Sequence, residues 1–157
     1  MYKKIMVPLD GSKLAECVLP HLETMVRAGK PTPEVLLVQA VEPIAIPYGR
    51  EVAEITSMDQ LKAFETHNEV EAKKYLKEIA AQLAKVGVNA KTDVIYGKAA
   101  TVLGDFASKN EVDLVIIATH GRSGISRWAW GSVADRLLRS ACVPVLMVRV
   151  PGCVPIS

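Results

Sequence analysis

The stretch Leu114-Val115-Ile116-Ile117-Ala118 decides the fold, because it is apolar throughout and rich in β-branched side chains. A strand without polar alternation is buried on both faces, which is typical of a mostly parallel sheet covered by helices. Four further strands are predicted, at residues 4–9, 35–41, 88–95 and 143–150. The strand over residues 88–95 alternates more strongly between apolar and polar residues, which predicts one wetter face.

Helical segments separate these strands, at residues 12–28, 57–86, 98–109 and 132–140. Gly29 is expected to end the first helix, and Gly87 the second, which opens with capping-box spacing over residues 57–60. Pro20 lies inside the first helix and should kink it by removing a backbone donor. Strand–helix alternation throughout the chain predicts a three-layer α/β domain with right-handed crossovers.

Composition limits the function classes. The chain has 157 residues, half of them apolar and 23% charged, which is typical of a single globular domain spanning residues 1–157. Nineteen Lys and Arg against seventeen Asp and Glu are too balanced for general nucleic-acid binding, and no apolar run is long enough to span a membrane. Cys17, Cys142 and Cys153 are too few and too widely spaced for a disulfide framework or a zinc site. Cys17 and Cys142 are interpreted as small buried apolar residues, and the expected location is the cytoplasm.

A ligand site is expected at the carboxyl ends of the strands, where open α/β sheets bind their ligands. Residues 8–12, residues 40–42 and the chain from Ala118 onward should converge there. In the last of these segments, Gly121 and Gly131 allow close approach of the backbone, and Ser132 stands at an expected helix N-cap, with Asp135 at the reciprocal capping position. This arrangement favours phosphate binding, although turns and helix capping alone would explain the same residues.

Five motifs in order resemble the universal stress protein family over nearly all of the chain. They are IMVPLDGS at 5–12, QAVEP at 39–43, ATHGRSG at 118–124, GSVADR at 131–136 and CVPVLMVR at 142–149. The resemblance implies an open, doubly wound, Rossmann-like α/β fold with a mainly parallel five-stranded sheet in the order 3-2-1-4-5 and helices on both faces. The nucleotide signature of the ATP-binding branch, G-x2-G-x9-G-[ST], reads here with Ala118 in place of the first glycine, followed by Gly121, Gly131 and Ser132.

The resemblance implies ATP or AMP as bound ligand. The implied contact residues are Pro8, Leu9, Asp10, Ala40, Ala118, Thr119, His120, Gly121, Arg122, Gly124, Gly131, Ser132 and Val133. Asp10 would accept hydrogen bonds from the ribose or the adenine, or else cap the turn before the first helix. Ala40 would meet the adenine through its backbone. Asp10 and Glu42 could share a Mg²⁺ ion brought by ATP.

Two interpretations of the whole protein stay open. No nucleophile with a paired base stands out, so we expect a binding protein with at most slow ATP hydrolysis rather than an enzyme. The last strand, Val143 to Val150, is expected at a sheet edge, and the resemblance implies that it pairs two copies into a homodimer. The alternative is a universal stress protein of the branch without nucleotide, acting as a dimeric interaction protein, which Ala118 favours.

Overall fold

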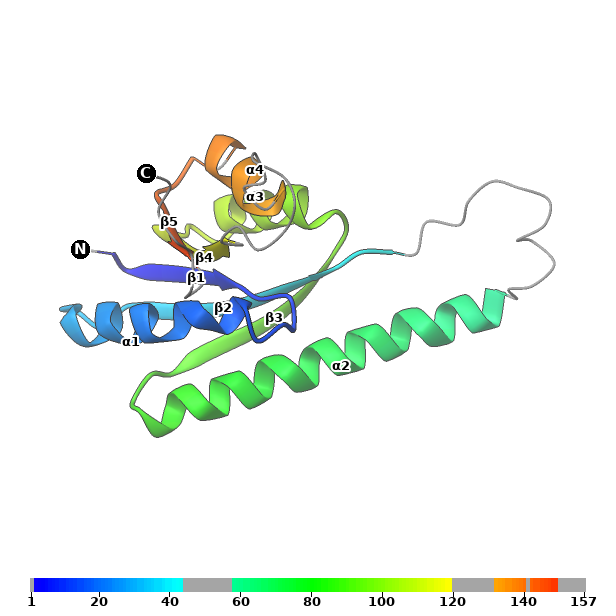
Figure 1. The fold of residues 1–157 in the computed structure, drawn as a ribbon, viewed down its shortest axis with the longest axis horizontal. Helices are drawn as coiled ribbons and strands as arrows, with labels where there is room; N and C mark the ends of the chain where they lie inside the picture. Colours follow the sequence, from blue (N-terminus) through cyan, green and yellow to red (C-terminus); the bar gives the residue numbers. More distant parts are fainter. Residues whose placement is uncertain (1, 44–57, 120–131, 141, 150–157) are drawn as a thin grey trace, which may run out of the picture.

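A parallel sheet with helices on both faces forms the structure, a computed structural model that describes residues 2–43, 58–119, 132–140 and 142–149 (Figure 1). The strands are β1 (Lys4–Pro8), β2 (Glu34–Val41), β3 (Ala90–Tyr96), β4 (Leu114–Thr119) and β5 (Val145–Arg149). The helices are the 3-10 turn η1 (Ala15–Val18), α1 (Leu19–Ala28), α2 (Met58–Lys85), α3 (Ala99–Lys109) and α4 (Ser132–Ser140). The strand order in the described residues is β3-β2-β1-β4-β5, all pairs being parallel, so the predicted fold and sheet order are confirmed.

Both faces of the central strands are buried, as their unbroken apolar sequences predict. Ile5 and Val7 of β1 pack with α1 and α2, whereas Met6 between them packs with α3 and α4 on the opposite face. The same alternation runs along β2, and Figure 1 shows the two helix pairs on either side of the sheet. The outer strand β3 is mostly exposed along its length, in agreement with its predicted wetter face.

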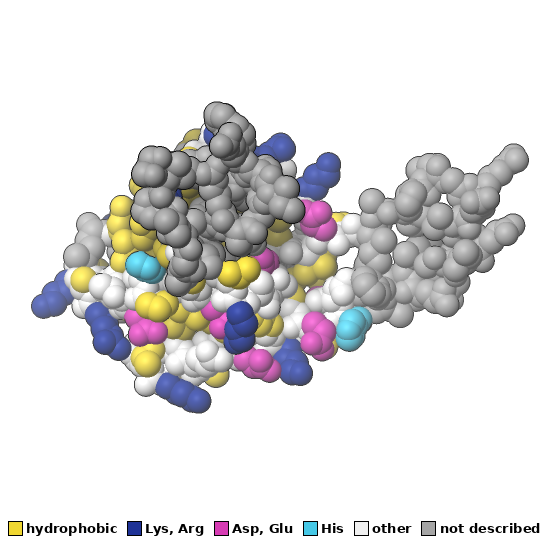
Figure 2. Space-filling view, in the orientation of Figure 1, with side chains coloured by type: hydrophobic (Ala, Val, Ile, Leu, Met, Phe, Trp, Pro, Cys, Tyr) yellow, Lys and Arg dark blue, Asp and Glu magenta, His cyan; other side chains and the backbone are white. Residues whose placement is uncertain are grey.

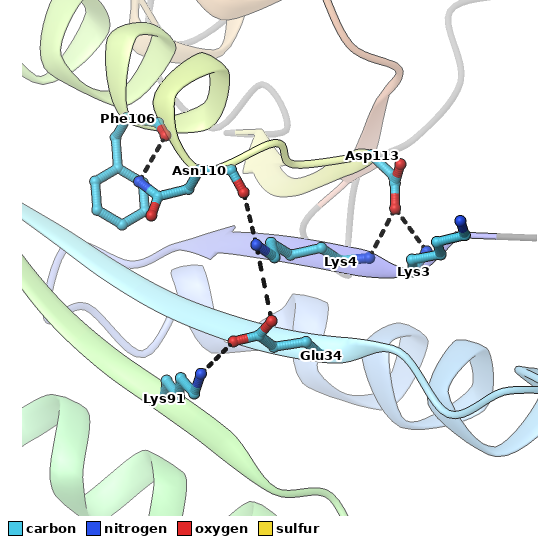
Figure 3. Close-up of polar contacts among 7 residues, drawn as sticks. All are labelled: Lys3, Lys4, Glu34, Lys91, Phe106, Asn110 and Asp113. Atoms are coloured by element: carbon cyan, nitrogen blue, oxygen red, sulfur yellow. Dashed lines mark hydrogen bonds and ion pairs between the residues drawn. The ribbon is translucent and has the colours of Figure 1, made fainter.

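A polar network ties the strands together at their amino ends (Figure 3). The Asp113 carboxylate accepts hydrogen bonds from the backbone N–H groups of Lys3 at 2.6 Å and Lys4 at 2.8 Å, which joins the start of β4 to β1. These two N–H groups hold the pKa of Asp113 below its usual value. The Glu34 carboxylate of β2 pairs with Lys91 of β3 at 2.6 Å and lies 3.8 Å from the Lys4 ammonium. The network therefore links four neighbouring strands.

The prediction of one kinked helix over residues 12–28 is wrong. The Ser12 hydroxyl accepts a hydrogen bond from the N–H of Ala15 at 3.2 Å, and the 3-10 turn η1 follows. The α-helix proper begins at Leu19, so Pro20 lies in its first turn, where no backbone donor is needed. Proline therefore helps to start this helix instead of kinking it.

The last strand is shorter than predicted. β5 begins at Val145, after Pro144, whose carbonyl accepts the N–H of Val115 at 3.0 Å but which has no N–H to donate. Cys142 precedes the strand and is exposed, so its expected burial is wrong, whereas Cys17 is half-buried against the core. Cys153 lies outside the described residues.

The visible surface carries both signs of charge. Figure 2 shows Lys and Arg side chains interspersed with Asp and Glu over the described part of one face. Within the described residues, no helix is both long and apolar enough to span a membrane.

Candidate functional site

A pocket of about 210 Å³ lies at the carboxyl edge of the sheet, and we call it the edge pocket. It is formed where β1, β2 and β4 end and where α3 and α4 begin. Its described lining consists of Pro8, Leu9, Asp10, Ser12, Leu14, Ala15, Ala40, Ala99, Leu103, Ile117, Ala118, Thr119 and Val133. The three segments that were expected to converge thus contribute to one pocket.

Several of the predicted contact residues meet in the edge pocket. They are Pro8, Leu9, Asp10, Ala40, Ala118, Thr119 and Val133. His120, Gly121, Arg122, Gly124 and Gly131 lie outside the described residues. Ser132 is the first residue of α4, and its side chain is also outside the description. The described site therefore consists of the strand ends and the first residues of the helices around them.

Asp10 shapes the turn that leaves β1. Its Oδ1 atom accepts the N–H of Ser12 at 2.9 Å, which is an Asx turn of the kind expected if Asp10 caps this segment. The side chain is exposed and makes no further hydrogen bond among the described residues. One carboxylate oxygen therefore holds the turn, while the other is left to accept a hydrogen bond from a ligand.

Thr119 directs its hydroxyl away from a ligand. The side chain is buried, and its Oγ1 atom donates to the carbonyl of Val148 in β5 over 3.5 Å. Its hydroxyl therefore faces the neighbouring strand, and Thr119 contributes mainly packing to the pocket wall.

Glu42 holds the start of α3 at the edge of the sheet. Its Oε1 atom accepts the N–H of Ala99 at 3.1 Å, and this N–H is one of the helix donors that lack an intrahelical partner. Gly97 donates to the carbonyl of Val41 at 3.1 Å and keeps this connection against β2. The carboxylate that could share a Mg²⁺ ion with Asp10 is thus already engaged through one oxygen.

Sequence reasoning missed the contribution of α3. Ala99 and Leu103 line the edge pocket, together with Leu14, Ala15 and Ile117, none of which carries a recognisable binding motif. A topological signal was nevertheless present, because every helix that follows a parallel strand begins at the same carboxyl edge. The first residues of a helix predicted over residues 98–109 were therefore candidates for the wall.

Asp135 makes an ion pair along α4, whereas its predicted reciprocal cap would involve Ser132, whose side chain lies outside the described residues. Its two carboxylate oxygens each accept from Nε of Arg139 at 3.1 Å, one helical turn further along α4. Because α4 begins at Ser132 and Val133 lines the edge pocket, the positive end of this helix faces the pocket.

Comparisons with known proteins agree with this architecture. A family model described as the universal stress protein family matches residues 1–149. Universal stress protein A homolog 2 of Coxiella burnetii is 32% identical over 154 residues, which cover 96% of this chain and 97% of the relative. Universal stress protein MJ0531 of Methanocaldococcus jannaschii is 29% identical over 154 residues, covering 96% of this chain and 84% of the relative. The solved structure of MJ0577, from the same archaeon, has a TM-score of 0.78 and 26% identity, covering 97% of this chain and 99% of that one. The chain therefore belongs to the universal stress protein family.

Proposed function

We propose that this protein binds an adenine nucleotide, ATP or AMP, in the edge pocket and acts as a regulatory module of the stress response rather than as an enzyme. The observation that carries the proposal is the convergence of Asp10, Ala40 and Ala118 on one pocket at the carboxyl ends of three adjacent strands. Ligands of open α/β sheets bind at this edge.

The pocket has the chemistry that a nucleoside monophosphate unit needs. Its strand-end wall is largely apolar and suits a base, and the free Asp10 oxygen suits a ribose hydroxyl. A volume of about 210 Å³ is below the roughly 300 Å³ at which small-molecule pockets usually begin, so the phosphates would extend towards the start of α4. Backbone N–H groups and the helix dipole favour an anion there.

Solved structures of the same fold support the choice of ligand. One universal stress protein was solved with cAMP, with a TM-score of 0.68 and 17% identity. A family member from Arabidopsis thaliana was solved with AMP bound, with a TM-score of 0.66 and 16% identity, and one from Archaeoglobus fulgidus with dAMP, with a TM-score of 0.62 and 20% identity. These likenesses show the fold alone, and the nucleotides belong to those proteins.

Calorimetry with ATP, ADP and AMP, with Mg²⁺ and with a chelator, tests the proposal through substitutions at Ala118. Ala118→Leu fills the pocket and should abolish binding, whereas Ala118→Gly restores the first glycine of the family signature and should bind at least as tightly as the wild type. Ala81→Leu makes the same chemical change at an exposed position of α2 and should leave binding unchanged. Absence of heat with every nucleotide, or wild-type binding by Ala118→Leu, would refute the proposal.

A second candidate function is favoured by Ala118 itself. Its methyl group stands at the mouth of β4 where the signature has glycine, and a universal stress protein with an empty pocket would act as an interaction protein. Mass spectrometry of protein purified without added ligand separates the two functions, because co-purified adenine nucleotide excludes this one.

We also propose that the protein is a cytoplasmic homodimer. In the described sheet β5 is an edge strand paired only with β4, and its apolar residues Val145, Leu146 and Met147 are half-buried. A second copy pairing along β5 would satisfy this edge. The free thiols of Cys17 and Cys142 fit a reducing compartment. Sedimentation equilibrium should give a dimer, and a monomer at every concentration would contradict the assembly.

A further inference from the structure

A second, larger pocket lies between β2 and α2, and we call it the α2 pocket. Its volume is about 520 Å³, which is within the range of small-molecule sites. Its lining residues are Gly11, Gln39, Ala40, Val41, Glu42, Asn68, Glu71, Ala72, Lys74, Tyr75 and Glu78. It shares only Ala40 with the edge pocket among their described lining residues, so the end of β2 and the turn after β1 divide the two spaces.

Gln39 is the one polar residue in the apolar run that follows Glu34 in β2. Val35 and Leu37 of β2 belong to the core cluster under α1 and α2, and the two-residue period of a strand places Gln39 on that same face. Its Oε1 atom is shut off from solvent and has no hydrogen-bond partner among the described residues. A buried acceptor without a hydrogen bond costs free energy, so we expect a ligand in the pocket to donate a hydrogen bond to it.

Tyr75 adds a second polar group to the pocket, from the side of α2. Its hydroxyl lies beside the Glu16 carboxylate, and neither the hydroxyl nor Glu16 Oε1 has a partner of standard hydrogen-bond geometry among the described residues. Burial raises the pKa of Tyr75, and the negative charges of Glu16 and Asp10 raise it further. The hydroxyl therefore stays neutral at physiological pH and can accept a hydrogen bond.

The charged side chains that line the α2 pocket favour a positively charged ligand. Glu42, Glu71 and Glu78 face the space against a single Lys74, and neither Glu71 nor Glu78 makes an ion pair with another described residue. Within the described part of the chain, no group of three acidic, His or Cys side chains is arranged to hold a metal ion. An organic cation is the ligand that satisfies both the carboxylates and the amide oxygen.

We propose that the α2 pocket binds a small organic cation with several N–H donors, an alkylamine or a guanidinium compound. Its charged end would lie between Glu71 and Glu78, and another N–H would donate to Gln39 Oε1. Charge-assisted hydrogen bonds of this kind are stronger than neutral ones. Anions of the same size would be excluded by the three carboxylates.

Calorimetry on the full chain with putrescine tests this site, and succinate, an anion of similar length, is the matched control ligand. Putrescine should bind saturably and succinate should not. Gln39→Met removes the amide at nearly constant shape and should weaken putrescine about tenfold, as loss of one hydrogen bond to a charged group does. The double variant Glu71→Gln, Glu78→Gln should weaken it several-fold, whereas Asp105→Asn on the opposite layer should bind as the wild type does.

Three results would overturn the proposal: no putrescine binding at millimolar concentration, equal binding of succinate, or wild-type affinity in Gln39→Met. Repeating the titration at saturating AMP separates this site from the edge pocket, because putrescine should still bind, and competitive displacement would contradict a separate site. Failure of AMP to bind while putrescine binds would refute only the nucleotide proposal.

Discussion

Among the glycines in the described part of the chain, Gly97 is the one at which an added methyl group should be most destabilising. It connects β3 to α3 with a φ of 129°, a backbone conformation that residues with a side chain rarely adopt. A Cβ atom added there would lie 2.5 Å from Cγ1 of Val102 in α3. Gly87, at the end of α2, also has a positive φ, of 85°, but a Cβ added there has no atom within 4 Å. A residue with a side chain would therefore be strained by the positive φ at both positions, but it would clash with a neighbouring side chain only at position 97.

The magnitudes follow from this difference. Gly87→Ala should cost about 1–2 kcal/mol of unfolding free energy, the cost of placing one ordinary residue at positive φ. Gly97→Ala should cost that amount and about 1–3 kcal/mol more, because Val102 or the backbone must shift to admit the methyl group. The helix that starts two residues later lines the edge pocket, so the strain falls beside the proposed site.

Urea unfolding of Gly97→Ala, Gly87→Ala, Val102→Ala and the double variant Gly97→Ala, Val102→Ala measures both contributions. In the double variant the clash is removed, so the excess over Gly87→Ala should largely disappear as a favourable coupling between the two positions. Equal destabilisation by Gly97→Ala and Gly87→Ala, or a coupling energy near zero between positions 97 and 102, would show that the clash with Val102 does not affect stability.

Three further outcomes are expected. Because the pKa of Asp113 is lowered in the folded state, its contribution to stability is present above the usual aspartate pKa of about 3.9 and is lost as the pH falls through the folded-state pKa. The difference in unfolding free energy between the wild type and Asp113→Asn, measured by urea unfolding, should therefore become smaller in acid. Leu76→Ala, at a fully buried position of α2, should cost about 2–5 kcal/mol in the same assay, whereas Val70→Ala, 54% exposed on the same helix, should stay within about 0.5 kcal/mol. The hydrogen bond to Glu69 raises the pKa of Tyr96 to about 12, so the Tyr96 ring should titrate late by NMR and return towards its ordinary value in Glu69→Gln.

The layers of the fold were predictable because burial on two faces leaves a strong signal. Runs such as residues 114–118 have no polar side chain, and a strand of that kind belongs in the middle of a parallel sheet. Local geometry was less predictable. Pro20 disfavours a helix interior but suits a first turn, and the sequence does not say which of the two it occupies until the start of the helix is known. The prediction that Cys142 is buried was wrong for a related reason. The strand begins only after Pro144, so Cys142 lies before it and is exposed.

The edge pocket was partly predictable, because parallel strands bring their carboxyl ends to one edge. Asp10, Ala40 and Ala118 could be grouped on that ground before any coordinates. The walls from α3 could not be chosen by residue type, because alanine and leucine carry no chemical signature. The α2 pocket left one trace in the sequence, the amide of Gln39 within an apolar strand, but its meaning depends on the side chains of α2 that face it.

The two ends of this sheet differ in how their polar atoms are used, and this difference supports the placing of both proposed sites at the carboxyl end. At the amino edge, Asp113 takes two backbone N–H groups and Glu34 takes two lysines, so the sheet satisfies its own charges (Figure 3). At the carboxyl edge, Asp10 keeps one oxygen and Gln39 keeps its amide oxygen without partners among the described residues. Polar groups that are not used to hold the fold together remain available for ligands. The strand ends and α2 place these groups beside the edge pocket and the α2 pocket, which is why we propose two chemically different ligands at one edge of the sheet.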